Sequence, residues 1–148
     1  GSFIPYHMAT KEFFDLVRQR LGTNGVVAFN VIGSLRGYQA DILGAVYRTM
    51  KAVFPQVYLF PARESENVVL VGTKSIREVT LSQLQRQADA LVRSQRMTLW
   101  NFRTRVASFR SLPPPNAERS PILTDDFAPV DGLLSRQSLN GLEPRKEP

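Results

Sequence analysis

The sequence predicts an α/β fold in which amphipathic helices cover the faces of a β-sheet. Segments with helical periodicity alternate with short apolar segments, in the order helix, strand, helix, strand, strand, helix. The chain has 148 residues, of which 43% are hydrophobic, and this suits a single hydrophobic core. We expect three layers, with helices on both faces of the sheet.

Residues 10–21 predict the first helix, because Phe13 and Val17 recur at helical spacing. Thr10 suits the N-cap, and Gly22 suits the C-terminal stop.

The first strand is predicted at residues 26–32, a continuous apolar run rich in β-branched side chains. Such a run is typical of a strand that is covered on both faces, as in the centre of a parallel sheet.

Two more helices and two more strands follow. The second helix, at residues 38–54, ends before Pro55 and the third spans about 81–97. The second helix has its periodic positions at Gln39, Leu43, Val46, Met50 and Val53, and the third has them at Leu84, Ala88 and Leu91. Between these helices, residues 57–60 and 67–72 predict two short strands that form a hairpin or a longer β-β connection.

The charge distribution divides the chain near Leu112. Residues 1–111 carry a net charge of +8, residues 112–148 carry −2, and seven of the ten prolines lie in the second part. Proline lacks a backbone donor and has a fixed φ, so we predict an α/β domain at 1–111 and a partly ordered, extended tail at 112–148.

Composition excludes several kinds of site. The chain has no cysteine and one histidine, which excludes disulfides, thiolate metal sites and His-rich metal centres, and we predict no metal ligands. No apolar run approaches the roughly 20 residues that span a bilayer. We therefore expect a cytoplasmic protein without a membrane segment.

Four sequence blocks carry a resemblance to a known family. They read IPYHMATKEFF from Ile4, GVVAFNVIGSL from Gly25, AVFPQVYLFP from Ala52 and LTDDFAPVD from Leu123. In this order they resemble the C-terminal half of bacterial spermidine synthase-like proteins, the polyamine aminopropyltransferase family. The resemblance implies the C-terminal part of a class I methyltransferase-like Rossmann fold, with the N-terminal half absent.

The resemblance also implies an activity, the transfer of an aminopropyl group from decarboxylated S-adenosylmethionine to putrescine. The family's Gly-rich nucleotide loop is not in this chain, since Gly33 and Gly37 do not form that motif. The family's general-base aspartate is also missing, because Ser2, Phe3 and Ile4 stand where it would lie. We predict no catalytic residue, no cofactor bound by this chain alone and no activity of the isolated chain.

Five residues are candidates for the substrate site. By the resemblance, Tyr6 and His7 lie at the end of a strand, where open α/β sheets bind ligands, and form a wall of the amine pocket. Asn30 matches a polar residue that lines the family's substrate site. The structural alternatives are that Tyr6 packs against other residues, that His7 caps or faces solvent, and that Asn30 has buried partners.

Asp125 and Asp126 are the other two candidates, because paired carboxylates accept hydrogen bonds from the ammonium groups of a polyamine. Alternatively, Thr124 or Asp125 caps a short helix whose dipole favours Asp126. We expect residues 129–134 to pack back on the core.

Residues 90–117 form a basic stretch without acidic side chains. Five arginines are interleaved there with three aromatic residues: Arg93, Arg96, Arg103, Arg105 and Arg110, with Trp100, Phe102 and Phe109. Arginines with aromatic rings suit single-stranded nucleic acid, but a solvated face or an acidic partner is the more frequent explanation.

The absence of an N-terminal half has a consequence for assembly. The strand at 26–32 lacks a neighbour on one edge, so we expect a homo-oligomer, completion by a missing N-terminal half, or aggregation. Two alternatives to the aminopropyltransferase function remain, a nonenzymatic α/β protein-interaction module and a basic single-stranded nucleic-acid binder.

Overall fold

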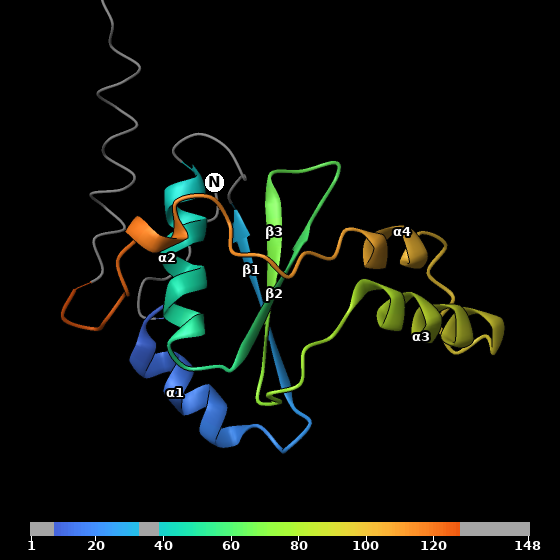
Figure 1. Ribbon diagram of the computed structural model, residues 1–148, viewed down its shortest axis with the longest axis horizontal. Helices are drawn as coiled ribbons and strands as arrows, with labels where there is room; N and C mark the ends of the chain where they lie inside the picture. The colour runs from blue at the N-terminus through green and yellow to red at the C-terminus, as the bar shows by residue number, and fades with distance from the viewer. Residues whose placement is uncertain (1–7, 33–38, 128–148) are drawn as a thin grey trace, which may run out of the picture.

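The computed structural model describes residues 8–32 and 39–127, which form a mixed α/β unit (Figure 1). In chain order the elements are α1 (Lys11–Arg20), β1 (Val26–Ile32), α2 (Gln39–Lys51), β2 (Gln56–Pro61), β3 (Asn67–Thr73), α3 (Leu81–Arg93), α4 (Phe102–Ala107) and the short 3-10 helix η2 (Ala117–Arg119). The predicted order of helices and strands is thus confirmed within this part of the chain.

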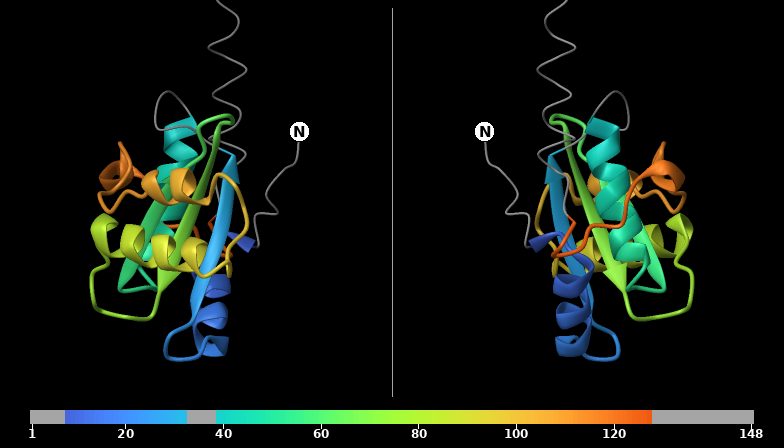
Figure 2. Two further views of the ribbon diagram at one scale, coloured as in Figure 1. Left: turned by 90° about the vertical axis from the view of Figure 1, so that its right-hand side faces the viewer. Right: turned by 90° about the vertical axis from the view of Figure 1, so that its left-hand side faces the viewer.

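The three strands form an antiparallel sheet in the order β1-β3-β2. The two views of Figure 2 place α2 on one side of the sheet and the α3–α4 pair on the other. The larger, three-layer Rossmann sheet stays a prediction.

The first strand was predicted to be parallel and covered on both faces, and both expectations are wrong. β1 pairs antiparallel with β3. It lies at an edge of the sheet among the described residues, which agrees with the neighbour expected to be missing on one side. Its side chains alternate in exposure, with Val31 buried while Val26 is 55% exposed and Ile32 is 38% exposed. An apolar run alone does not encode what covers it, and here one face of β1 remains open among the described residues.

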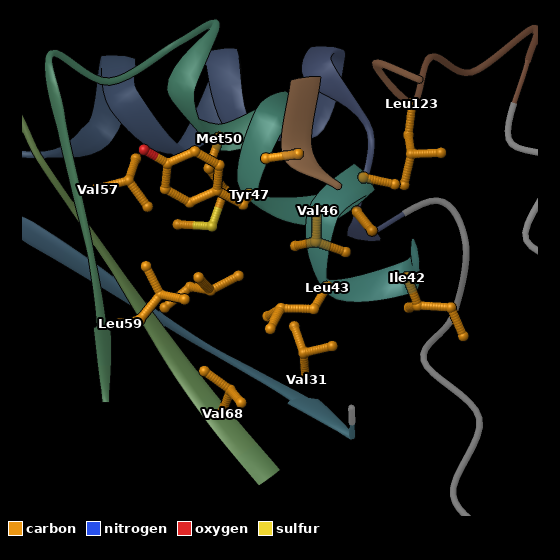
Figure 3. Close-up of a cluster of buried hydrophobic side chains, with 14 of the residues drawn as sticks. Val31, Ile42, Leu43, Val46, Tyr47, Met50, Val57, Leu59, Val68 and Leu123 are labelled. Carbon is orange, nitrogen blue, oxygen red and sulfur yellow. The ribbon is translucent and has the colours of Figure 1, made fainter. Parts of the chain in front are cut away.

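The hydrophobic core lies between α2 and the inner face of the sheet (Figure 3). Leu43, Val46 and Met50 of α2 are buried, which confirms the predicted face of this helix. The helix ends at Lys51, before the predicted end at residue 54, and Val53 is buried in the turn that follows it. These side chains pack in one cluster with alternate strand residues, namely Val31, Val57, Leu59, Val68 and Leu70. This one-sided packing gives the sheet an inner face on α2 and an outer face toward α3 and α4.

The described part of the predicted tail joins this core. Ala117 of η2 and Leu123 belong to the buried cluster. Arg48 of α2 donates hydrogen bonds to the carbonyl oxygens of Glu118 and Ser120, at 3.0 and 2.7 Å. These contacts hold the segment against α2.

Helix α3 is shorter than predicted and ends at Arg93 instead of near Met97. Gln95 has a left-handed backbone with φ of 59°, and the N–H groups of Gln95 and Arg96 donate to the carbonyls of Val92 and Leu91. These paired bonds form a Schellman motif, which ends the helix although its hydrophobic periodicity continues.

Candidate functional site

The candidate site is the turn at Thr124–Phe127, which presents Asp125 and Asp126 to solvent. Thr124 and Phe127 form two backbone hydrogen bonds with each other, of 2.9 and 3.1 Å. The Thr124 hydroxyl also accepts from the N–H of Phe127 at 3.1 Å. The chain thus makes a tight turn here. The residues after Phe127, in which the alternative short helix capped by Thr124 or Asp125 would continue, lie outside the described residues.

Buried polar contacts fix the start of this turn at Leu123. Thr49 is fully buried in α2, and its hydroxyl donates to the carbonyl of Ala45 and accepts from the N–H of Leu123, at 2.7 and 2.9 Å. The carbonyl of Leu123 accepts from the N–H of Lys11 at 2.8 Å. Both backbone groups of a buried residue are therefore satisfied, as burial requires.

The N-terminus of α1 provides the second support of the turn. Thr10 is the N-cap of α1, as predicted, and its hydroxyl accepts from the N–H of Phe13. Glu12 in the first turn accepts a hydrogen bond from the N–H of Asp125 at 3.0 Å. The exposed carboxylates of Asp125 and Asp126 thus project from a turn held by α1 and α2.

Gly44 allows the approach of the segment that leads into the turn. A Cβ atom at this position of α2 would lie 2.4 Å from the hydroxyl oxygen of Ser120 and 3.4 Å from the Cα of Ala117. The Ser120 hydroxyl donates to the carbonyl of Asn116 at 2.8 Å. A larger residue at position 44 would therefore push η2, and the turn beyond it, away from α2.

The structure does not bring Asn30 together with the two aspartates. Asn30 is exposed and alternates along β1 with Phe29 and Val31, whose side chains pack into the core on the inner face. Asn30 therefore lies on the outer face of the sheet, whereas Asp125 is bonded to α1 on the inner side. Among the described residues, exposed Asn30 therefore has no buried partner, and it does not share a pocket with Asp125.

Tyr6 and His7 lie outside the described residues, as do residues 129–134. No group of three or more histidine or acidic side chains suited to a metal ion occurs within 8–32 and 39–127. In the same ranges no helix is long and apolar enough to cross a membrane.

Thr49 and Gly44 position the turn, but sequence reasoning did not select them. Both interrupt the apolar periodicity of the second helix, and a hydroxyl or a glycine at such a position is the signal that could have identified them.

A comparison with curated proteins finds one relevant relative. The chain is 30% identical over 138 residues to the polyamine aminopropyltransferase of Vibrio vulnificus. The match covers 90% of this chain and 42% of the relative, so the chain spans less than half the length of the protein it matches. No family model matches the chain, and no solved structure matches it significantly. The resemblance stated from the sequence is therefore confirmed as a partial similarity.

Proposed function

We propose that this chain is the C-terminal portion of a spermidine synthase-like protein, which when complete transfers an aminopropyl group from decarboxylated S-adenosylmethionine to putrescine. The observation that carries the proposal is the similarity to the Vibrio vulnificus polyamine aminopropyltransferase, because it extends over 90% of this chain. The fold proposed for the complete protein is the methyltransferase-like Rossmann fold.

The turn at Asp125 and Asp126 is the proposed contribution of this chain to amine binding. Two exposed carboxylates on a turn with a fixed backbone can accept charge-assisted hydrogen bonds from a diamine. The anchoring through Thr49 and Glu12 supports this role, because a fixed acceptor loses less conformational entropy on binding. The donor site and the proton acceptor are assigned to the portion that this chain does not contain.

Calorimetry with putrescine, spermidine and methylthioadenosine tests the binding role. We expect the chain to bind putrescine and not methylthioadenosine, and the double variant Asp125→Asn/Asp126→Asn to lose putrescine binding. Glu118→Gln is the matched control, because Glu118 is an exposed acidic residue of the same segment outside the turn. Equal putrescine binding by the double variant would contradict the role of the turn.

A chimera tests the function itself. The chain is fused to the part of the Vibrio vulnificus enzyme that it does not match, folding is verified by circular dichroism, and aminopropyl transfer is measured. Transfer by the chimera and none by the isolated chain is the expected result. A folded but inactive chimera would count against the assignment.

We also propose that the free edge of β1 pairs with another strand. The backbone N–H and C=O of Leu59 both bond Arg110, at 2.9 and 2.8 Å, so they point away from β3. Backbone groups alternate in direction along an antiparallel ladder, so the N–H and C=O of Leu70 point toward β1 and bond the backbone of Phe29. The backbone groups of Ala28 and Asn30 consequently point to the outer edge of β1.

No strand pairs with this outer edge among the described residues. Unpaired backbone groups beside exposed apolar side chains are a template for strand addition. The proposed partner is the missing N-terminal portion or, in its absence, a second copy of the chain. Sedimentation velocity at tens of micromolar should show dimers or larger species, and a stable monomer would contradict the proposal.

A further inference from the structure

The α3–α4 arm, defined here as residues 81–107, extends away from the sheet and carries an exposed tryptophan. In Figure 1 the connection between α3 and α4 lies at the right-hand extreme of the molecule. The two helices pack mainly against each other, and Arg103 of α4 bonds Asp89 of α3 at 2.7 Å. Trp100 in the connection is 90% exposed and the adjacent Leu99 is 42% exposed.

The exposed tip of the arm, formed by the connection between α3 and α4, presents more than one apolar side chain. Trp100 and Leu99 line a hollow of about 450 Å³ together with Val92, Met97 and Arg103. An exposed tryptophan beside exposed leucine has a hydration cost that a globular monomer usually avoids. Such a tip is therefore a candidate contact surface.

The charge of the arm identifies the kind of partner. The arm contains five arginines and one aspartate, a net charge of +4, and all five arginines are exposed. Arg93 and Arg96 lie next to the tip on the α3 side, and Arg103 and Arg105 lie on the α4 side. A partner that matches this surface presents negative charge around an apolar layer.

We propose that the tip of the α3–α4 arm docks on anionic phospholipid surfaces. Trp100 and Leu99 enter the interfacial region, where tryptophan is favoured, and the flanking arginines contact the phosphate headgroups. The docking is peripheral, because the apolar tip is short.

The packing of the other aromatic residues favours a membrane over single-stranded nucleic acid. Phe109 is half-buried and stacks on Tyr58 and Phe60, at ring distances of 5.1 and 5.7 Å. Phe102 is also half-buried, so Trp100 remains the exposed ring of the three in this stretch. A nucleic-acid platform uses several exposed rings along a basic groove, and exposed Leu99 has no role in it.

The tryptophan is itself the probe, because the 148-residue chain contains no other. The chain is mixed with vesicles of phosphatidylcholine with and without phosphatidylglycerol, and Trp100 emission is recorded. We expect a blue shift and quenching by brominated lipid that require phosphatidylglycerol and decrease at high salt. Unchanged emission with anionic vesicles would overturn the proposal.

Co-sedimentation with the same vesicles compares variants. Trp100→Ala should weaken binding at least about tenfold, since it removes the largest inserting side chain. Arg93→Gln and Arg96→Gln should each weaken it roughly fivefold. Ile76→Ala is the matched control, because Ile76 is an apolar side chain 81% exposed outside the arm, and its binding should be unchanged. If Ile76→Ala lost as much vesicle binding as Trp100→Ala, the proposal would be overturned. Quenching of Trp100 by a single-stranded oligonucleotide without any response to vesicles would also overturn it.

Discussion

At the scale of single residues, a few buried contacts fix the segment that carries the two candidate carboxylates. Thr49 is the principal one, because its hydroxyl has a donor and an acceptor role in a fully buried position. Its position on the apolar face of α2 was predictable from the periodicity, but its partner Leu123 was not, since 74 residues separate them.

Thr49→Val should destabilise the protein by about 1–3 kcal/mol, because the N–H of Leu123 would remain buried without an acceptor. Urea unfolding followed by circular dichroism measures the loss. Thr49→Ser keeps the hydroxyl and should cost less than the valine variant, whereas the reverse order would contradict the role of this hydrogen bond.

Gly44→Ala should destabilise the protein, although alanine is the better helix former by about 1 kcal/mol. The added Cβ would lie within 2.4 Å of the Ser120 hydroxyl oxygen, and overpacking of this kind costs about 1–3 kcal/mol. In a double-mutant cycle, Ser120→Ala should remove part of the penalty. Additive effects of the two substitutions would show that the contact is not the cause.

Tyr47 in α2 gives the stability a pH dependence in the alkaline range. Burial raises the pKa of Tyr47 above its usual value of 10.0. Above pH 10 the hydroxyl of Tyr47 loses its proton in the unfolded chain before it does so in the folded protein, so the free energy of unfolding falls as the pH rises. Below pH 10 the hydroxyl is protonated in both states and has no effect on stability. Tyr47→Phe should therefore have a smaller alkaline decrease of the melting temperature than the wild type, and equal decreases would contradict this origin.

At the scale of elements, side-chain periodicity predicted where helices and strands occur but not how the strands pair. α1 with its Thr10 cap, the buried face of α2 and the two strands of the hairpin follow the sequence pattern. The antiparallel pairing of β1 does not, because an apolar run has the same local pattern whether its neighbour is parallel or antiparallel. The end of α3 depends on a backbone conformation at Gln95 that no composition rule indicates.

Gln95→Gly should stabilise the end of α3 by about 0.5–1 kcal/mol, because glycine adopts positive φ without the steric cost of a Cβ. Amide hydrogen exchange of residues 94–97 measures this local gain. Gln95→Ala retains the strain and should show no increase in protection. Equal protection in both variants would mean that the left-handed conformation carries no cost here.

At the scale of the whole molecule, the outer edge of β1 and the outer face of β1 are left without a partner among the described residues. The inner face is closed by α1, α2 and the segment through Leu123. The open outer edge of β1 was predicted from the resemblance to a C-terminal half, whereas the direction of its backbone groups required the register of all three strands.

Ala28→Pro should abolish self-association of the chain and leave its fold intact. Proline removes a donor that points to the free edge, and it leaves the Phe29 to Leu70 bonds inside the sheet in place. Sedimentation velocity with circular dichroism distinguishes the two effects, and Ala28→Val is the control that keeps the donor. Association that persists in a folded Ala28→Pro protein would place the contact elsewhere.

The position of Trp100 determines which optical signal can follow denaturation. The tryptophan is 90% exposed in the connection between α3 and α4, whereas Thr49 and Leu43 are fully buried in α2. Its emission maximum should therefore hardly move while the interior melts in urea. Tyrosine fluorescence or far-ultraviolet ellipticity, and not indole emission, would be the appropriate observable for the stability of this protein.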